Sequence, residues 1–278
     1  DTDDAFNQTI NIIKDFKYAR YTPLLYLKDK KKYAQMLAAQ HNMGGFMKGI
    51  LGKRLESSFY AFSKTLDRFA ESYTKFIAMA KSGKVYISKK VNVYDLLDSG
   101  DTKKLMYLLE QQDIMEFETK EFSSQFIRDL EADLAQLISL QFIWSMIKVD
   151  PKLEEFRHNI STNPLMKGKK MIVFTESMET AEYLYSQLQS IYHDRIVYYS
   201  GQSSPALKIE IEDSFNPKFK NKDNNKYDLL ITTDVLAEGI NLHRANVLVN
   251  YDLPWNPTRI MQRVGRINRV GTEHDRIY

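Results

Sequence analysis

The sequence predicts an α/β fold, in which a parallel sheet with helices on both faces is preceded by a mainly α-helical domain. Two observations predict it. In the second part of the chain, four short apolar runs alternate with segments in which apolar residues have helical spacing. Before them, apolar residues recur every three or four positions over two long stretches. We therefore expect a helical region at 1–165 and an α/β domain at 166–278.

The helical region is predicted to contain two long amphipathic helices, at about 46–81 and 122–147. Shorter helices are expected at 5–19, 29–41 and 102–112. Helix-breaking residues are expected to separate these segments. The breaks are placed at Asn42 to Gly45, at Ser82-Gly83 and at Asp150-Pro151.

The four strands of the α/β domain are predicted at 170–176, 196–199, 229–233 and 247–251. In a parallel sheet the carboxyl ends of the strands share one edge, and ligands collect beyond that edge. Several polar or small residues fall there: Thr175, Gly201, Thr232, Thr233, Asp234 and Asp252. The sequence therefore predicts a binding site at this edge.

Residues 262–269 place Gln262, Arg266 and Arg269 at positions i, i+4 and i+7, on one face of a helix. Two guanidinium groups and an amide that converge in this way suit a polyphosphate. The alternative is a solvated basic helix. The preceding strands favour the polyphosphate.

The motifs resemble those of the second RecA-like lobe of superfamily 2 helicases, over about 167–278. Residues 170–175 are similar to motif IV of that family, 199–201 to motif IVa and 232–242 to motif V. Residues 262–269 match the Gln-x-x-Gly-Arg-x-x-Arg spacing of motif VI. The stretch 252–257, Asp-Leu-Pro-Trp-Asn-Pro, resembles the Swi/Snf-like branch, and its bacterial members end motif VI much as Arg269-Val270-Gly271 does.

The resemblance implies roles for individual residues. Arg266 and Arg269 would be arginine fingers that reach a nucleotide on another lobe. Gln262, Glu238, Gly239 and Asn241 would lie near that nucleotide. Contacts to nucleic acid are implied for Thr175, Gly201, Thr232, Thr233 and Trp255.

Some of these residues have structural alternatives. The threonines would instead pack or cap at strand ends, Trp255 would anchor its loop in the core, and Glu238 would pair with an arginine. Arg263 is expected to be a surface or structural arginine.

ATP and Mg²⁺ are the cofactors that the resemblance implies, although no phosphate loop and no paired acidic magnesium motif occur in the 278 residues. Those parts would belong to the N-terminal RecA-like lobe of the same parent chain. The start at Asp1 and the end at Tyr278 read as those of an excised piece, which we expect to be inactive alone. The expected partner is double-stranded DNA. An RNA helicase and a non-catalytic nucleic-acid-binding module are the alternatives.

Composition sets further limits. The formal net charge of +3 restricts nucleic-acid contact to local patches, and the absence of cysteine fits a reducing cytoplasm. No apolar stretch approaches the roughly 20 residues that cross a bilayer. The five histidines are scattered, so we expect no metal site. One basic stripe faces either phosphates or solvent; it comprises Lys48, Lys53, Arg54, Lys64 and Arg68.

Overall fold

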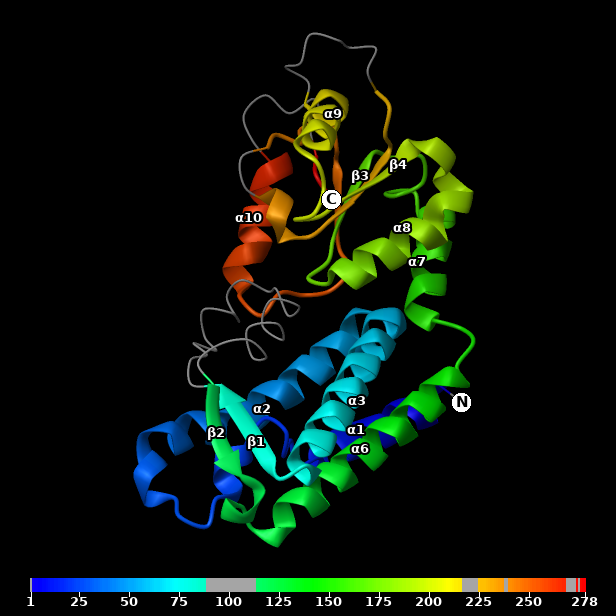
Figure 1. Ribbon diagram of the computed structural model, residues 1–278. Helices are drawn as coiled ribbons and strands as arrows, with labels where there is room; N and C mark the ends of the chain where they lie inside the picture. Colours follow the sequence, from blue (N-terminus) through cyan, green and yellow to red (C-terminus); the bar gives the residue numbers. More distant parts are fainter. Residues whose placement is uncertain (1, 89–113, 217–224, 238–239, 269–273, 275) are drawn as a thin grey trace. The chain divides into compact units, whose positions relative to one another are not determined.

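The structure, a computed structural model, describes residues 2–88, 114–216, 225–237, 240–268, 274 and 276–278 (Figure 1). It divides into two units, Asp1–Lys148 and Val149–Tyr278, and each is described by itself. Among the described residues, no helix has the length and apolar character needed to span a membrane.

The first unit is mainly helical. Its long helices are α1 (Thr2–Asp15), α2 (Ala34–Ser57), α3 (Phe59–Lys81) and α6 (Ser124–Ser145). Short 3₁₀ turns lie at Pro23–Tyr26, Lys31–Tyr33 and Thr119–Glu121. Strands β1 (Lys84–Ser88) and β2 (Ile114–Glu118) form an antiparallel pair that the sequence analysis missed. The helix predicted at 102–112 lies outside the described residues.

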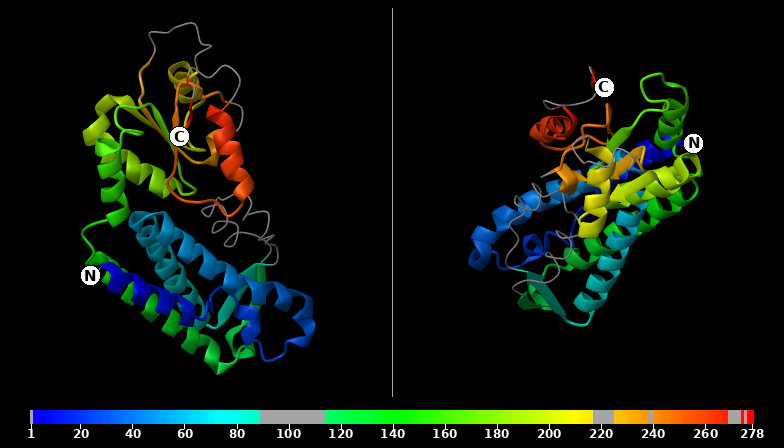
Figure 2. Two further views of the ribbon diagram at one scale, coloured as in Figure 1. Left: turned by 180° about the vertical axis from the view of Figure 1, so that it is seen from behind. Right: turned by 90° about the horizontal axis from the view of Figure 1, so that it is seen from above.

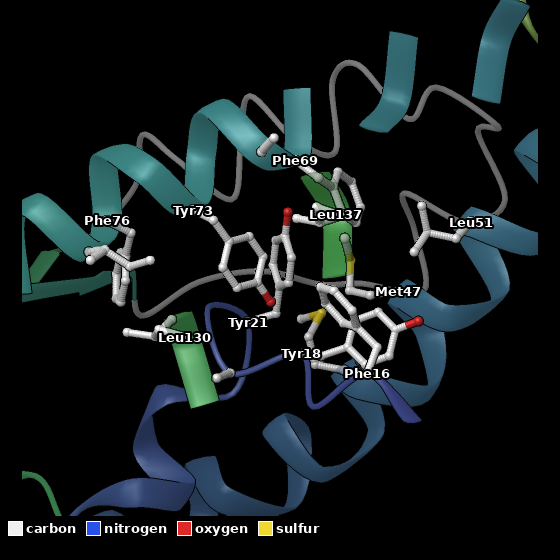
Figure 3. Close-up of a cluster of buried hydrophobic side chains, with 14 of the residues drawn as sticks. Phe16, Tyr18, Tyr21, Met47, Leu51, Phe69, Tyr73, Phe76, Leu130 and Leu137 are labelled. Carbon is white, nitrogen blue, oxygen red and sulfur yellow. The ribbon is translucent and has the colours of Figure 1, made fainter. Parts of the chain in front are cut away.

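The predicted break at Asn42 to Gly45 is wrong, because α2 continues through both glycines to Ser57. Met47 and Leu51 on α2 are fully buried (Figure 3), so packing outweighs the low helix propensity of glycine. The chain breaks instead at Ser58, whose hydroxyl accepts a 3.0 Å hydrogen bond from the Ala61 backbone and caps α3. The break at Ser82-Gly83 is confirmed; Gly83 has a φ of +102°.

An aromatic core holds this unit together, and Figure 3 shows Tyr73 of α3 directed into it. Asp133 of α6 lies buried there and accepts hydrogen bonds from the Tyr73 hydroxyl (2.9 Å) and from the backbones of Lys17 and Ala19 (both 2.8 Å). Burial raises the pKa of Asp133 to about 6, although these hydrogen bonds lower it. One carboxyl group therefore ties three distant segments together.

The second unit begins with α7 (Pro151–Thr162). Asp150 and Pro151 start this helix rather than ending the helical region: the Asp150 carboxylate accepts from the Leu153 backbone at 3.1 Å, and proline is favoured at the first helical position. Leu153, Phe156 and Ile160 pack against the sheet. The division between the units therefore falls after Lys148, earlier than the predicted boundary at 165.

Four parallel strands form the sheet, in the order β4-β5-β3-β6. They are β3 (Met171–Phe174), β4 (Ile196–Tyr199), β5 (Leu229–Thr232) and β6 (Val247–Asn250), within the predicted segments. The helices that follow are α8 (Met178–Tyr192), α9 (Pro205–Phe215), the short 3₁₀ helix η5 (Asp234–Ala237) and α10 (Pro257–Ile267).

Both faces of the sheet are covered, as predicted. Alternate residues of β3 point to opposite sides: Ile172 packs with Phe215 of α9 and Ile267 of α10, whereas Val173 packs with Leu184 of α8. Figure 2 accordingly shows α8 and α10 on opposite sides of the sheet. The carboxyl ends of the strands share one edge beside α10, and the candidate site lies there.

Candidate nucleotide and nucleic-acid interface

The ends of β3 and β6 are joined by a buried hydrogen bond. The Thr175 hydroxyl donates to one oxygen of the Asp252 carboxylate at 2.6 Å, and the Glu176 backbone donates to the other at 2.7 Å. Thr175 also accepts from the Ser177 backbone at 3.2 Å. Both Thr175 and Asp252 are almost completely shielded from solvent. These polar side chains therefore form a rigid base beneath the edge of the sheet.

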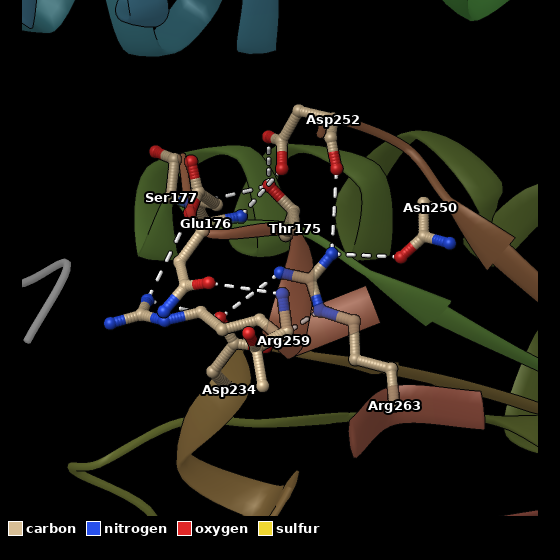
Figure 4. A network of polar contacts seen from close by, with 10 residues as sticks. Thr175, Glu176, Ser177, Asp234, Asn250, Asp252, Arg259 and Arg263 are labelled. Atoms are coloured by element: carbon tan, nitrogen blue, oxygen red, sulfur yellow. Dashed lines mark hydrogen bonds and ion pairs between the residues drawn. The ribbon is translucent and has the colours of Figure 1, made fainter. Parts of the chain in front are cut away.

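Arg263 of α10 lies at the centre of the network in Figure 4 and has no exposed surface. Its guanidinium forms a fork on the Asp234 carboxylate, with Nε–Oδ1 at 2.6 Å and Nη2–Oδ2 at 3.1 Å. Nη1 donates to the Asn250 side chain at 2.8 Å and to the Asp252 carbonyl at 3.4 Å. Of the two roles expected for Arg263, the structure supports the structural one.

A second arginine of α10 shares the same carboxylate. Arg259 Nη1 lies 3.3 Å from Asp234 Oδ2 and 3.9 Å from Glu176 Oε1. Arg259 and Arg263 are one helical turn apart, so both face inward toward the strand ends. Positive charge at this edge is thus neutralised by acidic side chains that follow β3 and β5.

The neighbouring face of α10 carries two of the predicted nucleotide-site residues. Gln262 is exposed and Arg266 is half-buried, again one helical turn apart. The Leu242 backbone donates to the Arg266 carbonyl at 3.2 Å, so α10 is bonded to the segment that follows η5. Asn241 is half-buried in that segment. Glu238, Gly239 and Arg269 lie outside the described residues.

The predicted nucleic-acid contacts fall into two groups. Thr175 and Thr232 are fully buried; the Thr232 hydroxyl donates to the Thr233 carbonyl at 3.0 Å, and Thr233 is itself buried. Gly201 is exposed, and Trp255 has 55% of its surface exposed. The core-anchor alternative for Trp255 is therefore wrong.

The basic stripe of the first unit is not a continuous row of exposed cations. Arg54 is buried, Lys53 forms a 2.9 Å ion pair with Glu56, and the Lys48 ammonium donates to the Lys14 carbonyl at 3.0 Å. This arrangement favours the solvated-face alternative. Within the described ranges, no cluster of three or more histidine or acidic side chains is arranged to hold a metal ion.

Sequence reasoning missed the inward pair of arginines, although a signal was present. In 257–267, the apolar residues Ile260, Val264 and Ile267 mark the face of α10 that packs on the sheet, and Arg263 falls on that face. Arginine at a core position needs an acidic partner, because burying an unpaired charge is costly. Asp234, which follows β5, is that partner.

Comparisons with known proteins match the second unit to helicases. Residues 152–271 match the family model for the helicase conserved C-terminal domain. Over 106 residues the chain is 40% identical to an uncharacterized ATP-dependent helicase, YqhH, of Bacillus subtilis, which covers 38% of this chain and 17% of that protein. It is 27% identical to DEAD-box ATP-dependent RNA helicase 15 of Arabidopsis thaliana over 125 residues, covering 44% of this chain and 27% of that one.

Among solved structures, the chain resembles the Hef helicase domain of Pyrococcus furiosus, with a TM-score of 0.44 and 16% identity; the alignment covers 99% of this chain and 52% of that one. The chain spans about a sixth to a quarter of the length of the two curated relatives. Its sequence motifs, parallel sheet and family match agree: residues 152–271 are similar to helicase conserved C-terminal domains.

Proposed function

We propose that this chain is the second motor lobe of an ATP-dependent helicase or translocase of the Swi/Snf-like branch. The observation that carries the proposal is that different side chains of α10 bind inside the protein and lie at the ligand edge. Arg259 and Arg263 contact Asp234, whereas Gln262 and Arg266 lie on the neighbouring face of the same helix, beside the edge where ligands of such sheets collect. Since Arg263 is buried on Asp234, Gln262 and Arg266 are the side chains of α10 proposed to meet a phosphate chain.

In this proposal, ATP and Mg²⁺ are held mainly by the N-terminal RecA-like lobe of the parent. Arg266, with Arg269, supplies positive charge to the phosphates as charge develops during transfer. Arginine fingers in comparable systems accelerate phosphoryl transfer by about 10³–10⁵-fold. Gln262, Glu238, Gly239 and Asn241 line the same nucleotide site.

Nucleic acid is proposed to lie along the carboxyl edge of the sheet. Gly201 offers an exposed backbone at the end of β4, and Trp255 offers an exposed aromatic surface before α10. Backbone amides and aromatic rings bind phosphates and bases without reading sequence, as a translocating motor requires. Thr175, Thr232 and Thr233 support that surface from beneath.

Double-stranded DNA is the proposed substrate, because Trp255-Asn256-Pro257 resembles the Swi/Snf-like branch. The second candidate is RNA, which is favoured by the similarity to an ATP-dependent RNA helicase. The test is the ATPase activity of the full-length parent with duplex DNA, single-stranded DNA or RNA. Strongest stimulation by duplex DNA supports the proposal. Stimulation by RNA alone would replace the substrate, and no ATPase activity at all would overturn the motor assignment.

A further inference from the structure

Arg263 has almost all of its hydrogen-bonding capacity used inside the protein. A guanidinium has five N–H donors. The hydrogen bonds of Nε, Nη1 and Nη2 reach Asp234, Asn250 and Asp252, and the guanidinium carbon lies 5.2 Å from the centre of the Phe174 ring. Since the side chain has no exposed surface, it cannot itself touch a ligand.

Stability alone gives a weak reason for such a residue. Replacing a buried ion pair with well-packed apolar side chains is often neutral or stabilising. An apolar side chain, however, does not fix the orientation of its partner as a hydrogen-bonded pair does. The planar fork of arginine fits a carboxylate in one orientation, which neither methionine nor the single ammonium of lysine reproduces.

The fork fixes the rotation of α10 about its own axis. Arg263 is flanked on the helix by Gln262 and Arg266, which lie on a neighbouring face. If α10 rotates or slides, these two side chains move with it. Arg259 makes a looser contact with the same Asp234 at 3.3 Å, so the carboxylate holds two successive turns of the helix.

The same contact joins α10 to the residues after β5. Asp234 is the first residue of η5, which leads into 238–242. At the far end of that segment, the Leu242 backbone donates to the Arg266 carbonyl at 3.2 Å. Asp234 and Leu242 are therefore both bonded to α10.

We infer that Arg263 is a positioning residue, which acts through Asp234 to hold α10, with Arg266, in one fixed arrangement against residues 234–237. The inference rests on the proposed function, since it concerns how the nucleotide-facing side chains are aligned. The Arg263 guanidinium also bonds to Asn250 and to the Asp252 carbonyl at the end of β6. These contacts fix the position of α10 relative to the sheet.

The test uses the full-length parent with Arg263→Met and Arg263→Lys. The matched control is Ile160→Ala, which removes buried contacts of α7 on the opposite face of the sheet and touches no part of α10. We expect Arg263→Met to lower kcat by about 10²-fold at an unchanged KM for ATP, because small misplacements of catalytic groups have effects of that size. Arg263→Lys should give an intermediate kcat, and Ile160→Ala should lower the Tm but retain the kcat of the folded protein.

The inference would be overturned if the turnover of Arg263→Met fell only in proportion to its amount of folded protein, as expected for the control. If Arg263→Met does not fold, Arg263→Lys is judged by the same criterion. Hydrogen exchange in the 278-residue chain provides a second readout: Arg263→Lys should accelerate exchange in both 234–237 and 257–267, and the control in neither. Arg266→Ala distinguishes the inference from the proposed function. Wild-type turnover in Arg266→Ala would contradict the proposed function. Wild-type turnover in Arg263→Met, with turnover lost in Arg266→Ala, would contradict only this inference.

Discussion

The Thr175 hydroxyl donates a 2.6 Å hydrogen bond to Asp252 across the neighbouring strands β3 and β6. Both groups are buried, and Asp252 also accepts from the Glu176 backbone. The backbone carbonyl of Asp252 is a partner of Arg263. Thr175 is thus connected to α10 through a single residue, and its hydroxyl is occupied within the protein.

Thr175→Val should therefore lower the stability of the second unit rather than its affinity for nucleic acid. Removing one donor from a buried carboxylate costs about 1–3 kcal/mol. Urea unfolding of the 278-residue chain measures this loss, and Thr162→Val, at an exposed position of α7, is the control. Weaker nucleic-acid binding with unchanged stability would show that Thr175 contacts phosphate directly.

Trp255→Ala should have the opposite effect: it should weaken nucleic-acid binding and leave the stability unchanged. More than half of this side chain is exposed, so its removal should leave the free energy of unfolding almost unchanged. If bases stack on it, nucleic-acid binding should weaken by about 1–3 kcal/mol. Fluorescence anisotropy with labelled duplex DNA measures the affinity. Ile209→Ala, an exposed apolar position on α9, is the control, and equal affinities of wild type and Trp255→Ala would exclude stacking.

Asp133 gives the first unit a pH-dependent stability. Its folded pKa is about 6, above the ordinary value of 3.8, so between these pH values the folded state binds more protons than the unfolded state. The free energy of unfolding should therefore fall as pH rises from about 4 to about 6, by up to about 3 kcal/mol.

The contribution of Asp133 is isolated by comparison with Asp133→Asn, which cannot titrate. The variant should be less stable, because its amide presents a donor to the backbone donors of Lys17 or Ala19. Urea unfolding followed by the fluorescence of the buried Trp144 measures both proteins. A stability advantage of wild type that grows from pH 4 to pH 6 would contradict the raised pKa.

The isolated 278-residue chain should not hydrolyse ATP. It contains no phosphate loop, and its proposed role is to supply charge to a nucleotide held elsewhere. A phosphate-release assay on the purified chain, with and without duplex DNA, measures this. Turnover above that of a catalytically dead Arg266→Ala chain would show that a complete nucleotide site lies within these residues.

The sheet could be predicted from the sequence because buried parallel strands are short, continuous apolar runs, and all four fall within the predicted segments. The placement of Gln262 and Arg266 on one face of α10 followed from helical periodicity.

Features decided by distant contacts could not be predicted. Gly44 and Gly45 read locally as a break, yet the packing of α2 keeps them helical. The hydrogen-bond partners of Arg263 come from two separate segments, after β5 and at the end of β6, so its fork on Asp234 depends on the assembled sheet. Asp150-Pro151 is locally compatible with the end or the start of a helix, and in the fold it starts α7.

The central claim is that α10 supplies an arginine finger to ATP hydrolysis, and the ATP turnover of Arg266→Ala in the full-length parent tests it most directly. Arg269→Ala is measured beside it. The account predicts a loss of about 10³–10⁵-fold in kcat with ATP binding and folding retained, as for other arginine fingers. Wild-type turnover in Arg266→Ala would contradict it.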